Sequence, residues 1–260
     1  MNVLVFSSAT RPDAVPATDR GRLAASCAES RFAPTADATA LADSDDAGGI
    51  DAERVAAAIR ADVTWVTAAF AGAATAPEVV VATTPDVATA LAGGVGVGGL
   101  RVIEVGAHAG SASLVRRAFD GRTGDDPVVV VDAAQPHAFD LKRLLSEHAG
   151  SPAIATVAVR AVPHFELCPA DMRLMEVDRT GRVLRMARAV VDRSPDRTPV
   201  GVAVLESKLI DHVPTGSQEF SVCGDLLPMV LRAGGIVSAV DVGPQVYAPF
   251  PPATSPLRTG

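Results

Sequence analysis

Four consecutive valines, Val128 to Val131, constrain the fold of this chain more than any other stretch. The run has no polar residue at alternate positions, so it predicts a strand that is buried on both faces. Such strands lie at the centre of sheets that helices cover on both sides. Pro127 can begin the strand, because that position does not need an N–H donor. Asp132, Ala133 and Ala134 follow as a turn at the carboxyl end, where open α/β sheets bind their ligands.

Strands and helices alternate through most of the rest of the chain. Apolar runs predict strands over residues 3–6, 78–82, 100–105, 153–159, 200–205 and 236–242. Apolar residues at helical spacing predict helices over 51–70, 86–91, 114–119 and 220–231, and another that begins near Phe139. A hairpin is predicted at 173–186. The order indicates an α/β fold with a mostly parallel central sheet, helices on both faces and an antiparallel excursion in the second half.

The length and composition fit one domain. The chain has 260 residues, of which 48% are hydrophobic, which is enough for a large core. We therefore expect a single domain over residues 1–260. Residues 21–50 are rich in Ala, Ser, Asp and Thr with weak periodicity, which predicts an irregular segment. The proline-rich residues 249–260 predict a frayed tail.

Charge and cysteine usage exclude several classes of function. The formal net charge is −7, and an acidic chain without a basic patch is not expected to bind nucleic acid. The three cysteines are far apart, which argues against a disulfide framework and against a zinc site. No uncharged stretch is long enough for a membrane span, and the first residues lack a basic n-region, so we expect a cytoplasmic protein.

Three other features are expected to be structural. Gly94, Gly96 and Gly99 match G-x-G-x-x-G, but they follow a predicted helix and precede a predicted strand, which is the wrong context for a dinucleotide site. Trp65 lies on or near the apolar face of its predicted helix, so core packing is expected for it. The histidines lack ligand-like spacing, and positions at the surface or in turns are expected for all five: His108, His137, His148, His164 and His212.

Several short motifs occur in an order that resembles a known family. They include Gly110-Ser-Ala, the strand at 128–131, Phe139-Asp-Leu, Glu176-Val-Asp-Arg-Thr-Gly-Arg-Val, and Glu219-Phe-Ser with Asp225-Leu-Leu-Pro further on. From residue 3 to about residue 243 this order resembles the sugar-1-phosphate nucleotidyltransferases, and most of all the mannose-1-phosphate guanylyltransferases and related NDP-sugar pyrophosphorylases. The resemblance implies a Rossmann-like nucleotidyltransferase (GT-A-like) fold. Enzymes of that family make an NDP-sugar and pyrophosphate from an NTP and a sugar 1-phosphate.

The family's signature loop is degenerate in this chain. The motif Gly-Gly-x-Gly-Thr-Arg-Leu-x-Pro falls on residues 8–16, where Ser8, Ala9 and Arg11 replace the three glycines. In the family these glycines let backbone amides wrap the phosphates, and a non-glycine residue forced into a left-handed conformation costs about 1–2 kcal/mol. The loop's activating arginine is replaced by Asp13, which repels a triphosphate. The resemblance therefore implies weakened phosphate binding.

The family's metal ligands and lysines are also replaced at the matching positions. Of the two aspartates that hold Mg²⁺, one aligns with Ala134 and the other falls near Ala248. Alanine offers no ligand, whereas Mg²⁺ needs several hard oxygens at close to octahedral geometry. The two lysines fall near Arg188 and Leu23. Because nucleotidyl transfer depends on metal and cationic clamps, the resemblance implies a pseudoenzyme with no catalytic residue, no metal and no cofactor.

Five residues are candidates for weak nucleotide binding. Ser8 and Arg11 lie in the first loop, where Arg11 either contacts an anion or is a solvated arginine. Gly110 and Ser111 either approach a base or ribose, or form a helix N-terminus that Ser111 caps. Asp132 either binds a displaced metal ion or is an ordinary strand-end aspartate, which is the commoner case.

The resemblance suggests two functions for the chain. The first is a regulatory or scaffolding protein in nucleotide-sugar or glycan-precursor metabolism. Its expected partners are an active nucleotidyltransferase paralogue, or another protein of the pathway, and an NDP-sugar. The alternative is a divergent active enzyme that makes an NDP-sugar such as GDP-mannose, with Mg²⁺ held by Asp132 and other acidic groups. A third hypothesis is a structural module whose pocket has collapsed.

Overall fold

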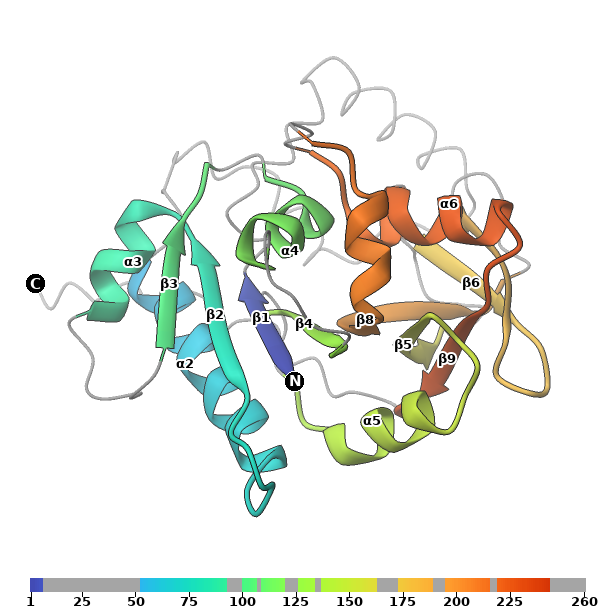
Figure 1. The fold of residues 1–260 in the computed structure, drawn as a ribbon, viewed down its shortest axis with the longest axis horizontal. Helices are drawn as coiled ribbons and strands as arrows, with labels where there is room; N and C mark the ends of the chain where they lie inside the picture. Colours follow the sequence, from blue (N-terminus) through green and yellow to red (C-terminus); the bar gives the residue numbers. More distant parts are fainter. Residues whose placement is uncertain are drawn as a thin grey trace, which may run out of the picture.

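Nine strands form one sheet in the computed structural model, which describes residues 1–6, 52–92, 100–106, 109–119, 126–133, 137–162, 173–188, 195–215 and 219–243. The strands are β1 (Asn2–Phe6), β2 (Glu78–Thr83), β3 (Leu100–Glu104), β4 (Val128–Asp132), β5 (Ala155–Ala161), β6 (Arg173–Val177), β7 (Val183–Arg188), β8 (Arg197–Leu205) and β9 (Val237–Asp241). The helices are α2 (Ala52–Ala69), α3 (Pro85–Ala92), α4 (Ser111–Phe119), α5 (Leu141–Ala149) and α6 (Leu227–Arg232), with a 3₁₀ helix η2 (Ser207–His212) and a π-helical turn η3 (Val222–Leu226) (Figure 1).

The order of strands across the sheet is β3-β2-β1-β4-β8-β5-β9. Strands β3, β2, β1 and β4 are parallel to one another, and β5 and β9 form a second parallel pair. Strand β8 is antiparallel to both β4 and β5, and the antiparallel β6–β7 hairpin pairs with its first residue. In Figure 1, β3 and β6 lie at opposite sides of the molecule. The predicted fold, a mostly parallel sheet with an antiparallel excursion in the second half, is therefore confirmed.

Helices cover both faces of the sheet, and this explains the purely apolar strands. On one face Val3, Val5, Val129 and Val131 pack against α2, α3 and α5. On the other face the alternate residues of the same strands, including Leu4 and Val130, pack against α4, α6 and the two short helical segments. Side chains alternate between faces along a strand, so a strand covered on both sides buries every residue. The valine run at 128–131 is fully buried at the sheet centre, as predicted.

Most of the predicted elements are present with small shifts at their ends. Helix α5 begins at Leu141, because Asp140 caps it by accepting hydrogen bonds from the backbone N–H groups of Lys142 and Arg143. The β6–β7 hairpin turns at Asp178, whose carboxylate accepts hydrogen bonds from the N–H groups of Thr180 and Arg182. The irregular segment predicted at 21–50, the glycine run at 93–99 and the tail predicted at 249–260 lie outside the described residues.

Two short segments differ from the prediction. The helix expected over 220–231 begins instead as the π-helical turn η3, in which the N–H of Leu226 donates to the Ser221 carbonyl oxygen. The Ser221 hydroxyl accepts the N–H of Gly224 and donates to the Asp225 carboxylate, which closes this turn. The helix η2 was not predicted, because its single buried residue, Leu209, gives no repeating apolar pattern. None of the helices in the described ranges is long and apolar enough to cross a membrane.

Candidate functional site at the carboxyl end of strand β4

Asp132 ends strand β4 at the edge of the sheet where the sequence predicts a ligand. Its partner across the parallel pair is Phe6 of β1. The backbone N–H of the next residue, the buried Ala133, donates to the Phe6 carbonyl oxygen at 2.6 Å. Asp132 itself is half-buried. The carboxyl ends of β1 and β4 are therefore held together, and the Asp132 carboxylate lies at the junction.

Gly201 of strand β8 brings two polar side chains close to this junction. Its φ is +82°, a conformation that favours glycine. A Cβ atom at this position would lie 3.2 Å from the Cβ atom of Asp132 and 3.5 Å from the Nε2 atom of His137. The absence of a side chain at Gly201 is thus what lets Asp132 and His137 approach the same stretch of backbone.

A thiol and a guanidinium interact electrostatically with one another near Asp132. Cys223 lies in η3 and Arg173 begins strand β6. Burial raises the pKa of the Cys223 thiol to about 12, the Asp132 carboxylate adds to the increase, and the Arg173 guanidinium opposes it. The thiol is therefore protonated at neutral pH and behaves as a small apolar group, not as a nucleophile.

The candidate residues Gly110 and Ser111 join helix α4 to the segment that precedes η3. A Cβ atom at Gly110 would lie 2.4 Å from the carbonyl oxygen of Phe220, so the two backbones are in direct contact. The Ser111 hydroxyl accepts a hydrogen bond from the backbone N–H of Val222 at 2.8 Å. These contacts give both residues a structural role between α4 and η3. Their contact with a base or ribose stays a prediction.

A buried carboxylate–imidazole pair lies close to Gly201. The Nδ1 atom of His137 is 2.9 Å from Oδ1 of Asp62, which projects from helix α2. The Nε2 atom of His137 is 3.0 Å from the carbonyl oxygen of Val200 in strand β8. The side chain of His137 is 1% exposed and that of Asp62 is 5% exposed. The pair therefore connects a helix, a strand and the stretch of chain between β4 and α5.

The proton count of this pair follows from its geometry. A carbonyl oxygen only accepts hydrogen bonds, so the Nε2 atom that faces Val200 carries a proton. One further proton lies between Nδ1 and Oδ1, on the carboxyl group or on the ring, and in both cases the pair has no net charge. Burial raises the pKa of the Asp62 carboxyl, His137 lowers it, and Asp132 raises it further. A neutral pair suits a site that excludes water.

Two aromatic rings enclose the imidazole of His137. The indole of Trp65 stacks on it with ring centres 5.4 Å apart and an interplanar angle of 21°. Phe139 meets both rings edge to face. The indole Nε1–H also donates to the Phe139 carbonyl oxygen at 3.1 Å. Trp65, a residue of α2, is partly buried against the core, so the core packing predicted for it is correct.

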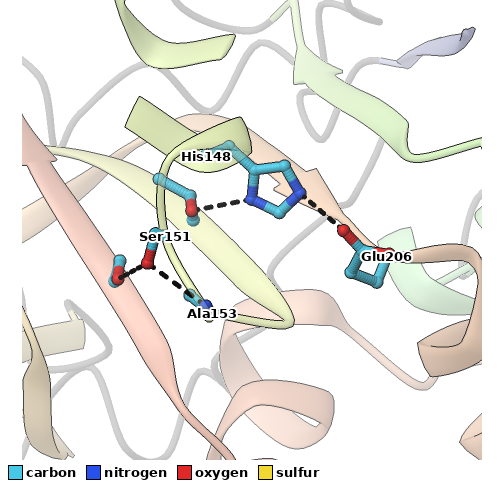
Figure 2. Close-up of polar contacts among 6 residues, drawn as sticks. His148, Ser151, Ala153 and Glu206 are labelled. Atoms are coloured by element: carbon cyan, nitrogen blue, oxygen red, sulfur yellow. Dashed lines mark hydrogen bonds and ion pairs between the residues drawn. The ribbon is translucent and has the colours of Figure 1, made fainter. Parts of the chain in front are cut away.

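The expected surface or turn position is wrong for His148, and His137 lies in the stretch between β4 and α5 but with its side chain buried. His137 is buried as described above, and His148 in the last turn of α5 is 5% exposed. The ring of His148 lies 2.8 Å from the Thr156 hydroxyl and 3.1 Å from the Glu206 carboxylate (Figure 2). Spacing along the sequence does not show that a histidine has partners on distant strands. His212 is exposed, as expected, and His108 and His164 lie outside the described residues.

The His148 network lies at the other end of the sheet from Asp132. Glu206 directly follows β8, whose last residue pairs with the first residue of β4, and Thr156 lies near the start of β5. Nearby, the hydroxyls of Ser151 and Ser238 are 3.2 Å apart, and the Ser151 hydroxyl accepts the N–H of Ala153 (Figure 2). This network therefore supports the fold and does not belong to the candidate site.

His148 should make stability fall in mild acid. Burial lowers the pKa of its ring below 6.5, although Glu206 acts in the opposite direction. Between the folded and unfolded pKa values the unfolded chain binds more protons, so the free energy of unfolding decreases as the pH falls below about 6.5. We expect His148→Gln to reduce this dependence when urea unfolding is measured between pH 7.5 and 5. An unchanged pH dependence in the variant would contradict the assignment.

The structure places only part of the predicted nucleotide site. Gly110 directly precedes α4, Ser111 begins it and Asp132 ends β4, whereas Ser8, Arg11 and Ala134 lie outside the described residues. Within the ranges that the structure describes, no three or more His, Cys, Asp or Glu side chains are grouped to hold a metal ion. Ala134 and Ala248, which align with the family's Mg²⁺ ligands, lie outside the described ranges, so the loss of metal binding stays a prediction.

Sequence reasoning missed the Asp62–His137 pair, although one signal was present. The apolar positions Val55, Ile59, Val63 and Val66 predict the buried stripe of α2, and Asp62 lies within that stripe at helical spacing. A carboxylate on a buried face requires a partner. Its partner is 75 residues away in the sequence, so spacing gave no indication of which residue it is.

The fold is the mixed α/β, Rossmann-like fold of solved nucleotidyltransferases. The structure is similar to the inositol-1-phosphate CTP transferase from T. maritima, with a TM-score of 0.58 and 12% identity over 93% of this chain and 85% of that one. It is also similar to a CMP:2-keto-3-deoxy-manno-octonic acid synthetase complexed with CTP, with a TM-score of 0.53 and 16% identity over 70% of this chain and 79% of that one. At such identities the likeness shows the fold alone.

At the level of sequence, part of the chain is similar to one curated enzyme. No protein-family model matches this chain. A stretch of 112 residues is 30% identical to the UTP–glucose-1-phosphate uridylyltransferase of Synechocystis sp.. This stretch covers 42% of the chain and 28% of the relative, so the match spans little more than a quarter of the relative's length. The comparisons support the predicted nucleotidyltransferase resemblance, while the mannose specificity and the loss of catalysis stay predictions.

Proposed function

We propose that the protein is a non-catalytic nucleotidyltransferase-like protein that serves nucleotide-sugar or glycan-precursor metabolism as a regulatory or scaffolding partner. Its expected ligand is an NDP-sugar, and its expected protein partner is an active nucleotidyltransferase paralogue or another protein of the pathway. The fold and the partial similarity to a UTP–glucose-1-phosphate uridylyltransferase support the metabolic context. The described residues near Asp132, at the carboxyl end of β4, form no group of three or more metal-ligating side chains, and this supports the loss of catalysis.

One observation supports this proposal: among the described residues near the end of β4, no three His, Cys, Asp or Glu side chains are grouped to hold a metal ion. The Asp62 carboxylate is held by His137, and the Cys223 thiol stays protonated. Ala133, which follows Asp132, offers no ligand, and the described residues form no metal-binding group. Nucleotidyl transfer depends on metal ions and cationic clamps to stabilise charge on the phosphates. A scaffold without them can still bind a ligand or a partner.

A second function is favoured by one feature, the position of Asp132. Its carboxylate lies at the carboxyl end of the central strand, next to β1, where open α/β sheets bind ligands. A divergent enzyme that makes an NDP-sugar would use Asp132 as a Mg²⁺ ligand, together with groups from residues outside the described ranges. The two functions differ in whether Asp132 is needed for turnover.

A pyrophosphate-release assay separates the two. The full chain is incubated with Mg²⁺ and with each of the four NTPs paired with mannose 1-phosphate or glucose 1-phosphate. We expect no release above that of the matched Asp132→Asn variant. Release by the wild-type chain at ordinary enzyme rates, lost in Asp132→Asn, would reject the non-catalytic function in favour of the divergent enzyme.

A further inference from the structure

We propose that Asp62 and His137 are positioning residues that hold the backbone around Asp132 in place, through a neutral hydrogen-bonded pair clamped between helix α2 and strand β8. The pair would keep the backbone at the carboxyl end of β4 in one conformation. This positioning role is the same whether the site at the carboxyl end of β4 only binds a nucleotide or also catalyses its transfer, so it does not depend on the proposed function.

His137 is fixed from three directions. Asp62 Oδ1 holds its Nδ1 atom at 2.9 Å, and the Val200 carbonyl oxygen holds its Nε2 atom at 3.0 Å. Trp65 stacks on the face of the ring. Both nitrogens of the imidazole are thus satisfied by groups from different elements, and a planar ring held at both ends cannot rotate. The backbone of residue 137 is therefore tied to α2 and β8.

Gly201 links this pair to Asp132. It directly follows Val200, whose carbonyl oxygen binds His137, and its Cα atom lies close to Asp132. A Cβ atom at Gly201 would touch the Asp132 Cβ at 3.2 Å and the His137 Nε2 at 3.5 Å. Asp132 and the Asp62–His137 pair therefore face one short stretch of β8 backbone. A shift of His137 would move the surroundings of Asp132.

We expect the hydrogen bond from Asp62, and not its charge, to hold His137 in place. The second oxygen of Asp62, Oδ2, is buried and has no hydrogen-bond partner among the residues that the structure describes. Asparagine has the same shape, and its amide N–H can donate to Nδ1 of a neutral His137. Asp62→Asn should therefore keep a hydrogen bond to Nδ1 of His137. Asp62→Ala removes the partner of Nδ1 and leaves this buried polar atom unpaired.

Hydrogen–deuterium exchange followed by mass spectrometry tests the proposal on the full chain. We expect peptides that cover residues 132–140 to exchange about 10-fold faster or more in Asp62→Ala, because a buried polar atom loses its partner. The same peptides in Asp62→Asn should stay close to the wild-type rate. Peptides from helix α4, on the other face of the sheet, should be unchanged in both variants. The matched control is Glu147→Ala, an exposed carboxylate on α5.

Tryptophan fluorescence gives a second readout, because Trp65 is the single tryptophan of the chain. Its emission should shift to longer wavelength in Asp62→Ala and stay at the wild-type position in Asp62→Asn. If Asp62→Ala does not fold, His137→Gln serves instead, since one amide cannot reach both Asp62 and Val200. Wild-type exchange in Asp62→Ala, or exchange in Asp62→Asn as fast as in Asp62→Ala, would overturn the proposal.

Discussion

Replacing Gly110 with alanine should lower the free energy of unfolding by about 3 kcal/mol, because the added methyl group has no space. The nearest atoms to a Cβ at this position are the Phe220 carbonyl oxygen at 2.4 Å and backbone carbons of Glu219 and Phe220 at 2.5 Å. Backbone atoms cannot rotate away as a flexible side chain can. The segment before η3 must therefore move, and the hydrogen bond from Val222 N–H to the Ser111 hydroxyl is lost with it.

Gly106→Ala is the matched control for this prediction. Gly106 lies just after β3 and is exposed, and a Cβ atom added there would have no atom of the described residues within 4 Å. Alanine at such a position reduces the freedom of the unfolded chain and is neutral or stabilising by up to about 1 kcal/mol. Urea unfolding of the two variants measures the difference. Equal stabilities would show that α4 and the η3 segment are not packed as the structure has them.

Cys223 should react with iodoacetamide about 10³-fold more slowly in the folded protein than in the unfolded chain at pH 8, because the thiolate is the reactive form. With a pKa of about 12 instead of 9.0, its thiolate is scarce at that pH. Burial, the main cause of the shift, also restricts access of the reagent. Peptide mass spectrometry distinguishes Cys223 from Cys27 and Cys168. The same measurement in guanidinium chloride supplies the reference rate.

The Asp132→Asn variant tests whether Asp132, at the candidate site, acts on the Cys223 thiol. The Asp132 carboxylate raises the pKa of the Cys223 thiol, so its neutral replacement should speed the alkylation. Arg173→Met should slow it, because the guanidinium lowers that pKa. If the folded and unfolded rates agree within about 10-fold, the thiol is not buried as described. If Asp132→Asn leaves the rate unchanged, Asp132 does not act on this thiol.

The parts of the fold that sequence reasoning predicted depend on local patterns. The valine run at 128–131 identified the central strand because a strand covered on both faces buries successive residues, and valine is β-branched. Apolar residues at helical spacing predicted a helix that begins near Phe139, and α5 begins two residues later, after its cap Asp140. The turn at Asp178 followed from residues that favour tight turns. Each of these features is decided within a few residues, so the sequence contains the information.

The parts that were missed depend on contacts between distant segments. The burial of the His137 side chain was missed because its partners, Asp62 and Val200, are 75 and 63 residues away. His148 was misplaced for the same reason, since Glu206 is 58 residues away. The nucleotide-binding role of Asp132 stays a prediction. Its neighbours Cys223 and Arg173 come from segments that no motif connected to it.

We propose that this chain keeps a nucleotidyltransferase fold but has lost the metal-dependent chemistry at the end of β4. Calorimetric titration of UTP and CTP into the full chain, with Mg²⁺ and again with EDTA, tests it most directly. We predict that Mg²⁺ makes no difference: any affinity measured in its presence persists in EDTA. Nucleotide binding that appears only with Mg²⁺, and that Asp132→Asn abolishes, would contradict the claim.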